Sequence, residues 1–131
     1  MLDELHKISV DFRLEKARNC LDASEMLLSA SSFADSVNRS YYSIYHAIRA
    51  VLIIDGFSSK KHSGNIAEFR RRYIKTEIFP KEFSEIIGSA FDIRNDSDYE
   101  DFYVVSKEDV VKQAESARIF LNAVEDYIKT L

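Results

Sequence analysis

The chain of 131 residues holds 46% hydrophobic and 31% charged residues, the balance of a folded soluble protein rather than a disordered one. Its 3 glycines and 1 proline are too few for the frequent turns of an all-β protein, so they favour long helices joined by few loops. The formal net charge of −4 argues against a protein that coats nucleic acid indiscriminately.

The sequence also indicates no metal, cofactor or membrane segment. Cys20 is the single cysteine, so the chain can form neither an internal disulfide nor a cysteine-based zinc site. The 3 histidines are not spaced as metal ligands, and no glycine-rich phosphate loop or run of about 18 apolar residues occurs. Charged residues within residues 1–10 argue against a signal peptide. We therefore expect one cytoplasmic domain over residues 1–131, without a metal or cofactor.

The first two expected helices span about residues 2–29 and 33–55, separated by a serine-rich step. Ser32 and Asp35 have the spacing of an N-terminal cap, and Gly56 suits a helix C-terminus. The apolar stripe of the first helix consists of Leu14, Ala17, Leu21 and Leu28, with Leu5, Ile8 and Phe12 leading into it. That of the second consists of Val37, Tyr41, Ile44, Ile48, Val51 and Leu52. A second stripe of the same helix holds Arg39, Tyr42, His46, Arg49 and Ile53.

Three more helices follow the basic loop 57–62. A short one carries Ile66, Phe69 and Tyr73, and the next has Pro80 in its expected first turn with Phe83, Ile87, Ala90 and Arg94 on its inner face. Ser106 and Asp109 predict the start of the last helix. Its inner face holds Val110, Ala114, Ala117, Leu121, Val124, Ile128 and Leu131. The pattern predicts an all-α fold, an up-and-down bundle of four to five helices.

Charge is distributed unevenly along the chain. Residues 60–75 contain six basic side chains and one acidic one, whereas residues 92–109 contain seven acidic side chains and two basic ones. Separated patches of this kind favour either binding of an anion or pairing of the molecule with itself, and two solvated faces would also explain them.

Four segments in order carry a resemblance to a known family. They are residues 38–52 (NRSYYSIYHAIRAVL), residues 60–63 (KKHS), residues 90–94 (AFDIR) and residues 97–99 (SDY), followed by a final helix. Each segment is weak alone, but their joint order over nearly the whole chain resembles the HEPN superfamily. The chain is most similar to the small standalone HEPN proteins often encoded beside a minimal nucleotidyltransferase.

The resemblance implies a specific chemistry. Many HEPN proteins are metal-independent ribonucleases with an arginine, often followed by a polar residue, and a histidine four to six residues further on, and two protomers usually place these motifs face to face. The cation stabilises charge on phosphorus while the imidazole moves protons. Arg94 and Asn95 match the first half of this motif, but position 99 holds Tyr99. A phenol with an ordinary pKa of about 10 is a poor proton carrier at neutral pH.

The candidate site residues therefore fall into two groups. The resemblance assigns nucleotide or RNA binding to Arg94, Asn95, Asp98, Tyr99, Lys61 and His62, with Arg94 and Tyr99 as the catalytic pair if the protein is active. The second stripe, with Arg39, Tyr42 and His46, is a candidate cleft or dimer face. Each group also has a plain structural interpretation: Arg94 can pair with Asp92 or Asp98, and the stripe can pack against a helix.

Three functions remain open on this basis. The first is a HEPN module, expected as a homodimer, that binds a nucleotide or RNA and acts with a small nucleotidyltransferase in a toxin–antitoxin-like or defence pair. The second is an active endoribonuclease in which Tyr99 or His46 replaces the missing histidine. The third is a non-enzymatic interaction module that uses the Tyr42 stripe as a contact face.

Overall fold

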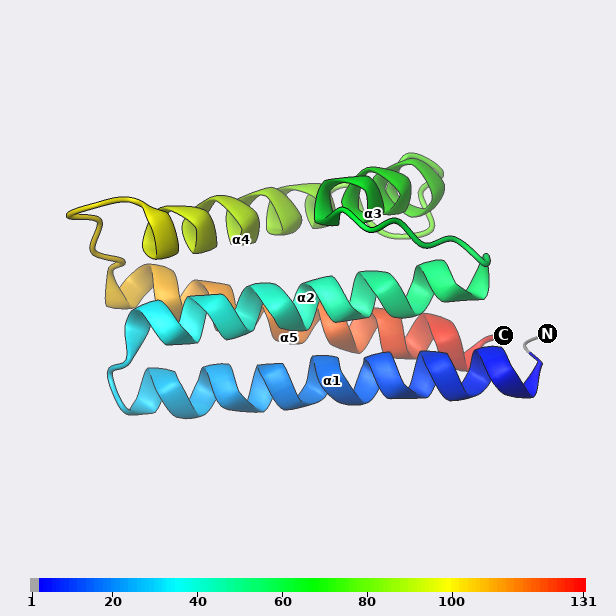
Figure 1. Ribbon diagram of the computed structural model, residues 1–131, viewed down its shortest axis with the longest axis horizontal. Coiled ribbons are helices and arrows are strands. Elements are labelled where there is room, and N and C mark those ends of the chain that lie inside the picture. The colour runs from blue at the N-terminus through cyan, green and yellow to red at the C-terminus, as the bar shows by residue number, and fades with distance from the viewer. Residues whose placement is uncertain (1–2) are drawn as a thin grey trace.

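The computed structural model describes residues 3–131. The helices are α1 (Glu4–Ser29), α2 (Phe33–Ile54), α3 (His62–Phe69), α4 (Glu82–Tyr99) and α5 (Lys107–Lys129), and a π-helical turn, η1 (Arg70–Ile74), continues α3. Figure 1 shows α1, α2, α4 and α5 lying along the long axis, with the short α3 near one end and both chain ends at that same end. The described residues contain no strand, which confirms the all-α bundle.

Helix α2 is the central element, because it packs against α1, α3, α4 and α5. All six apolar residues predicted for its core stripe are buried. Small serines let α1 approach closely, since Ser36 Oγ donates to the Ser24 carbonyl at 2.7 Å and Ser43 Oγ donates to the Ala17 carbonyl at 2.8 Å. The helix ends before Gly56, whose φ of 71° is the left-handed value that favours glycine there, as predicted.

The start of α1 differs from the prediction. Asp3 caps the helix by accepting the His6 backbone N–H at 2.8 Å, and the expected start at Leu2 lies outside the described residues. Leu5, Ile8 and Phe12 are exposed rather than buried. The inner stripe, continued back from Leu14 by one helical turn, passes through the buried Val10.

The other helix starts were predicted with mixed success. Ser106 caps α5 by accepting the Asp109 backbone N–H at 3.1 Å, as predicted. Ser32 stands at the start of α2, but its hydroxyl donates to the Asp35 carboxylate at 2.9 Å and caps no backbone N–H. Pro80 lies ahead of α4 instead of in its first turn.

Five aromatic side chains between α3 and α5 form an aromatic core. Phe69, Tyr73, Phe79, Phe83 and Phe120 are all buried, with ring centroids 4.9 to 6.1 Å apart between contacting neighbours. This core joins α3, η1 and α4 to α5. The inner faces predicted for these helices are confirmed except at Leu131, which is 53% exposed beyond the end of α5.

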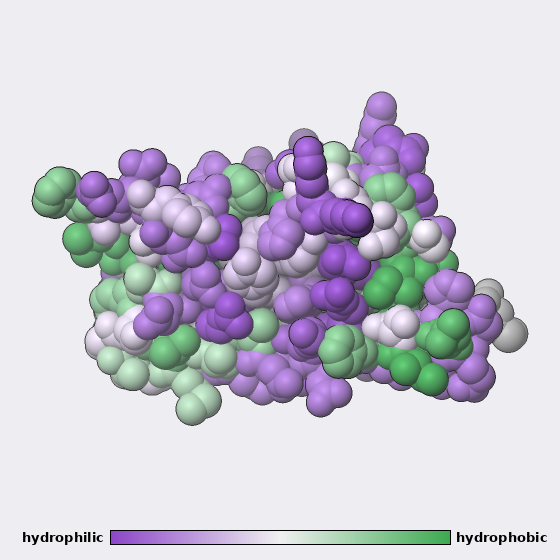
Figure 2. Space-filling model, viewed as in Figure 1, coloured by the Kyte–Doolittle hydropathy of each residue, from purple (hydrophilic) through white to green (hydrophobic). Residues whose placement is uncertain are grey.

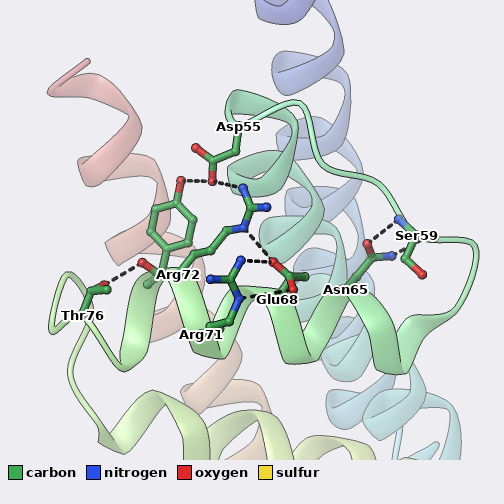
Figure 3. Close-up of polar contacts among 8 residues, drawn as sticks. Asp55, Ser59, Asn65, Glu68, Arg71, Arg72 and Thr76 are labelled. Carbon is green, nitrogen blue, oxygen red and sulfur yellow. Dashed lines mark hydrogen bonds and ion pairs between the residues drawn. The ribbon is translucent and has the colours of Figure 1, made fainter.

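The loop before α3 is held by a buried amide. Asn65 Nδ2 donates to Tyr45 Oη at 2.8 Å and to the Ser59 carbonyl at 3.0 Å, while its Oδ1 accepts the Ser59 backbone N–H at 3.0 Å. Figure 3 shows the two contacts to Ser59 closing the loop against α3. Because the amide satisfies these groups together, the loop delivers the first residue of α3, His62, to a defined position.

Candidate functional site

Arg94 lies within α4, which continues beyond it to Tyr99. Its guanidinium is held by three partners. Nη2 donates to Tyr42 Oη at 3.1 Å, Nη1 donates to Asn95 Oδ1 at 3.1 Å, and Nε lies 3.1 Å from Asp98 Oδ2 in an ion pair. The side chain is only 14% exposed, so this cation is both oriented and largely shielded from water.

Aromatic rings surround the same guanidinium. The Arg94 Cζ atom lies 5.3 Å from the ring centroid of Tyr41, 5.4 Å from that of Tyr42 and 5.6 Å from that of Tyr99. Tyr41 is buried, whereas Tyr99 is 70% exposed. Cation–π contacts of this kind hold a guanidinium in place without neutralising its charge.

A chain of hydrogen bonds links Arg94 to the second stripe of α2. Asn38 Nδ2 donates to Asp98 Oδ2 at 3.1 Å, and Asn38 Oδ1 accepts from Arg39 Nε at 3.0 Å and from Arg39 Nη2 at 2.7 Å. Asp98 thus receives contacts from Arg94 and Asn38, and the site extends from α4 onto α2. Asn38 is the first residue of segment 38–52 and was not among the predicted site residues, because only the fold places it between Asp98 and Arg39.

His62 joins this site from α3. Its Nδ1 lies 2.9 Å from Tyr41 Oη in a hydrogen bond, and its ring stacks on Tyr45 with centroids 3.9 Å apart. Burial lowers the pKa of His62, and the charges of Arg94 and Arg49 lower it further. Lys61, by contrast, is exposed at the start of α3. Of the two residues expected in the basic loop, His62 is the one placed beside Tyr41 and Tyr42.

His46 faces α1. The guanidinium of Arg13 donates from Nη1 to His46 Nδ1 at 3.1 Å. Since an arginine can only donate, Nδ1 must carry a lone pair and the ring must be neutral. Burial is the main reason that the pKa of His46 falls to about 4, and the surrounding charges of Arg13, Lys16, Arg39 and Arg49 add to the shift.

The basic segment 60–75 uses several of its cations internally, as Figure 3 shows around η1. Arg71 Nη2 and Arg72 Nε each lie 2.8 Å from Glu68 Oε2. Hydrogen bonds from these two arginines lower the pKa of Glu68 to about 2. Arg70 donates to the Ser84 carbonyl at 3.1 Å. The three arginines of this segment are therefore committed to holding η1 and α4 in place.

Two further properties concern the described residues 3–131. They contain no group of three or more His, Cys, Asp or Glu side chains arranged to hold a metal ion. None of the helices in this range is long and apolar enough to cross a membrane.

Comparison with known proteins identifies the class to which this fold and site belong. Residues 10–127 match the HEPN domain model, so the chain belongs to the HEPN domain family. A UPF0332 protein of Thermotoga maritima is 33% identical over 130 residues, covering 99% of this chain and 98% of the relative. The Methanocaldococcus jannaschii protein named "Putative toxin MJ0142" is 32% identical over 123 residues, covering 94% of this chain and 84% of the relative. A UPF0332 protein of Gloeobacter violaceus is 31% identical over 114 residues, covering 86% and 90%.

The structure thus brings together most of the predicted residues. Arg94, Asn95, Asp98, Tyr99, Tyr42 and His62 share one site, Arg39 connects to it through Asn38, and His46 lies on the adjoining face. Sequence reasoning missed Tyr41 as a partner of His62, and it missed Arg13 entirely. Arg13 lies 33 residues from His46 in the chain, and no local motif connects the two.

Proposed function

We propose that this HEPN protein binds a phosphate of a nucleotide or an RNA at Arg94. The observation that carries the proposal is the Arg94 guanidinium, oriented by Tyr42 and Asn95 and shielded by aromatic rings. Such a fork matches two phosphate oxygens and needs little reorganisation on binding. Asn95 and Tyr99 flank the bound group, and Lys61 and His62 approach it from the α3 side.

Asp98 partly neutralises the Arg94 charge that would attract a phosphate. Its carboxylate lies 3.1 Å from Arg94 Nε and competes with phosphate for that edge of the guanidinium. Binding therefore leaves Asp98 held by Asn38, which already donates to the same oxygen. Replacing Asp98 by Asn removes the competing charge and retains an acceptor, so it strengthens phosphate binding.

A second function, metal-independent RNA cleavage, is favoured by the position of His62. A histidine with a lowered pKa is neutral at pH 7 and can accept a proton. In this reaction His62 takes the proton of a ribose 2′-hydroxyl, the oxygen attacks phosphorus to form a 2′,3′-cyclic phosphate, and the 5′-oxygen leaves with a proton from water. Arg94 stabilises the charge on the phosphoryl oxygens. His62 takes this role in the tautomer whose Nδ1–H donates to Tyr41 Oη, because the Nε2 lone pair is then free. His46 has no such free lone pair, since its Nδ1 accepts from Arg13 and its Nε2 therefore carries the proton.

The proposal includes two partners, a second copy of this chain and a small nucleotidyltransferase. We propose that two copies pair with their Arg94 sites facing and that the pair acts with a small nucleotidyltransferase in a toxin–antitoxin-like system. The resemblance to standalone HEPN proteins supports this, as do two Methanocaldococcus jannaschii relatives with toxin in their names. Light scattering of the purified protein tests the dimer. A neighbouring gene for a nucleotidyltransferase, and co-purification of its product, tests the partner.

The deciding experiment measures RNA binding and cleavage in EDTA by wild type, Arg94→Gln, Asp98→Asn and His62→Gln, with Arg71→Gln as the control for loss of an arginine charge. We expect Arg94→Gln to weaken binding by about 10-fold or more and Asp98→Asn to strengthen it. Arg71→Gln should behave as wild type. Cleavage by wild type that His62→Gln abolishes makes the protein a ribonuclease. Equal binding by wild type and Arg94→Gln refutes the proposed site.

A further inference from the structure

Four cations gather around His46 on the face shared by α1 and α2. They are Arg13 and Lys16 from α1 and Arg39 and Arg49 from α2, and all four charges act on the His46 ring. We call these four residues the basic face. Among residues 3–131, none of the ion pairs involves any of them. Every other cluster of arginines described above has a carboxylate partner.

The basic face destabilises the folded protein when no ligand is bound. Arg13, Arg39 and Arg49 are half-buried, and burial together with the neighbouring Arg49 lowers the pKa of Arg13. The Nε atom of Arg49 is buried and has no hydrogen-bond partner. Like charges held together in a partly dry place repel one another, and an unpaired buried donor adds a further penalty. An anion bound at the exposed side of the basic face offsets the repulsion between these cations, which points to a ligand rather than to a structural role.

The basic face is continuous with the Arg94 site. The ring of Tyr42 lies between them, 5.1 Å from the Arg39 guanidinium and 5.4 Å from that of Arg94. The charges of Arg94 and Arg49 both lower the pKa of His62. In Figure 2 the middle of the face over α1 and α2 is mostly hydrophilic, while apolar residues gather toward its ends. The contacts therefore continue from Arg94 through Tyr42 to Arg39, and through the His46 ring to Arg13 on α1.

The length and composition of this surface distinguish between ligands. Arg49 follows Arg39 by ten positions, which places it about 15 Å further along α2, farther than one phosphate group can reach. Partly exposed rings stand among the cations, with the Tyr42 centroid 6.1 Å from that of His46 and 5.8 Å from that of His62. Alternation of cations with rings on which bases stack is typical of surfaces that bind single-stranded nucleic acid.

We propose that the basic face binds the backbone of a single-stranded RNA and leads it to Arg94. This inference rests on the proposed phosphate site and names its ligand as a strand of several nucleotides rather than a mononucleotide. Phosphates of the strand contact Arg13, Lys16, Arg39 and Arg49, and Tyr42, held between Arg39 and Arg94, keeps these two cations on one path. His46 remains a neutral spacer that accepts from Arg13.

The test compares wild type with the double variant Arg13→Gln/Arg49→Gln. The matched control, Arg71→Gln/Arg118→Gln, removes the same charge from residues that pair with Glu68 and Glu25 outside the basic face. The probes are labelled single-stranded RNAs of about 12 and about 4 nucleotides, within the site sizes of single-strand binders. Binding is followed by fluorescence anisotropy at several salt concentrations, with circular dichroism to confirm equal helix content.

We expect the double variant to bind the longer RNA at least about 10-fold more weakly than the control. We also expect the slope of log affinity against log salt to decrease by about 1.4, since each lost phosphate contact on a single strand contributes about 0.7. The shorter RNA should be affected less. If the double variant matches the control while Arg94→Gln loses binding, the basic face is refuted and the Arg94 site stands. If wild type binds neither RNA, the basic face is refuted and RNA is excluded as the ligand of Arg94.

Discussion

The environment of His46 predicts that the protein loses stability in mildly acid solution. The pKa of His46 is about 4 in the folded protein and about 6.5 in an unfolded chain. Between about pH 4 and pH 6.5 the His46 ring therefore binds a proton in the unfolded chain but stays neutral in the folded protein. The stability associated with the neutral ring is complete above pH 6.5 and is lost as the pH falls toward 4.

The size of the loss follows from the two pKa values. Between about pH 7 and pH 5 the linkage amounts to about 2 kcal/mol for an enclosed ring, and to about 1 kcal/mol once solvent screening of the half-buried ring is allowed for. The assay is urea unfolding followed by circular dichroism at both pH values. His46→Gln is the suitable comparison, because its amide oxygen can still accept from Arg13 but does not titrate.

The wild type should lose about 1 kcal/mol more than His46→Gln between these pH values. His62, whose pKa is also lowered, changes stability in the same direction, and it contributes equally to both proteins. Comparison with the variant therefore isolates His46. Equal losses in the two proteins would show that folding leaves the pKa of His46 at its unfolded value, and the contact in which Arg13 donates to His46 would then be wrong.

Three further substitutions test how the loop before α3 and the starts of two helices are held. Asn65→Ala leaves a buried tyrosine hydroxyl and the Ser59 backbone groups without partners, so urea unfolding should show a loss of about 2 to 3 kcal/mol; a loss below about 0.5 kcal/mol would mean that the loop is held by other contacts. Ser106→Ala removes the hydroxyl that accepts the Asp109 N–H and should cost about 1 kcal/mol. Ser32→Ala, at a helix start where the hydroxyl caps no backbone group, should cost clearly less, and the reverse order would contradict both assignments.

The sequence by itself determined the helices, the buried stripes and the family. These features depend on residues three or four positions apart, or on short motifs such as the Ser106 cap and the glycine at position 56, so they can be recognised locally. The same reasoning was wrong at the start of α1, where it extended the apolar stripe to residues that are exposed. Leu5 and Phe12 have helical spacing from one another, but only the neighbouring helices decide which face of α1 is covered.

Only the tertiary structure decided which charges remain available. Glu68 forms ion pairs with Arg71 and Arg72, so the arginines in the most basic segment of the sequence are not the ones most available to a ligand. The packing of α1 on α2 instead gathers Arg13 with Arg49 around His46, although these residues come from distant parts of the chain. The electrostatic properties of a side chain depend on its burial and on charges within a few ångströms, and helix packing sets both. Spacing along the sequence carries no such information.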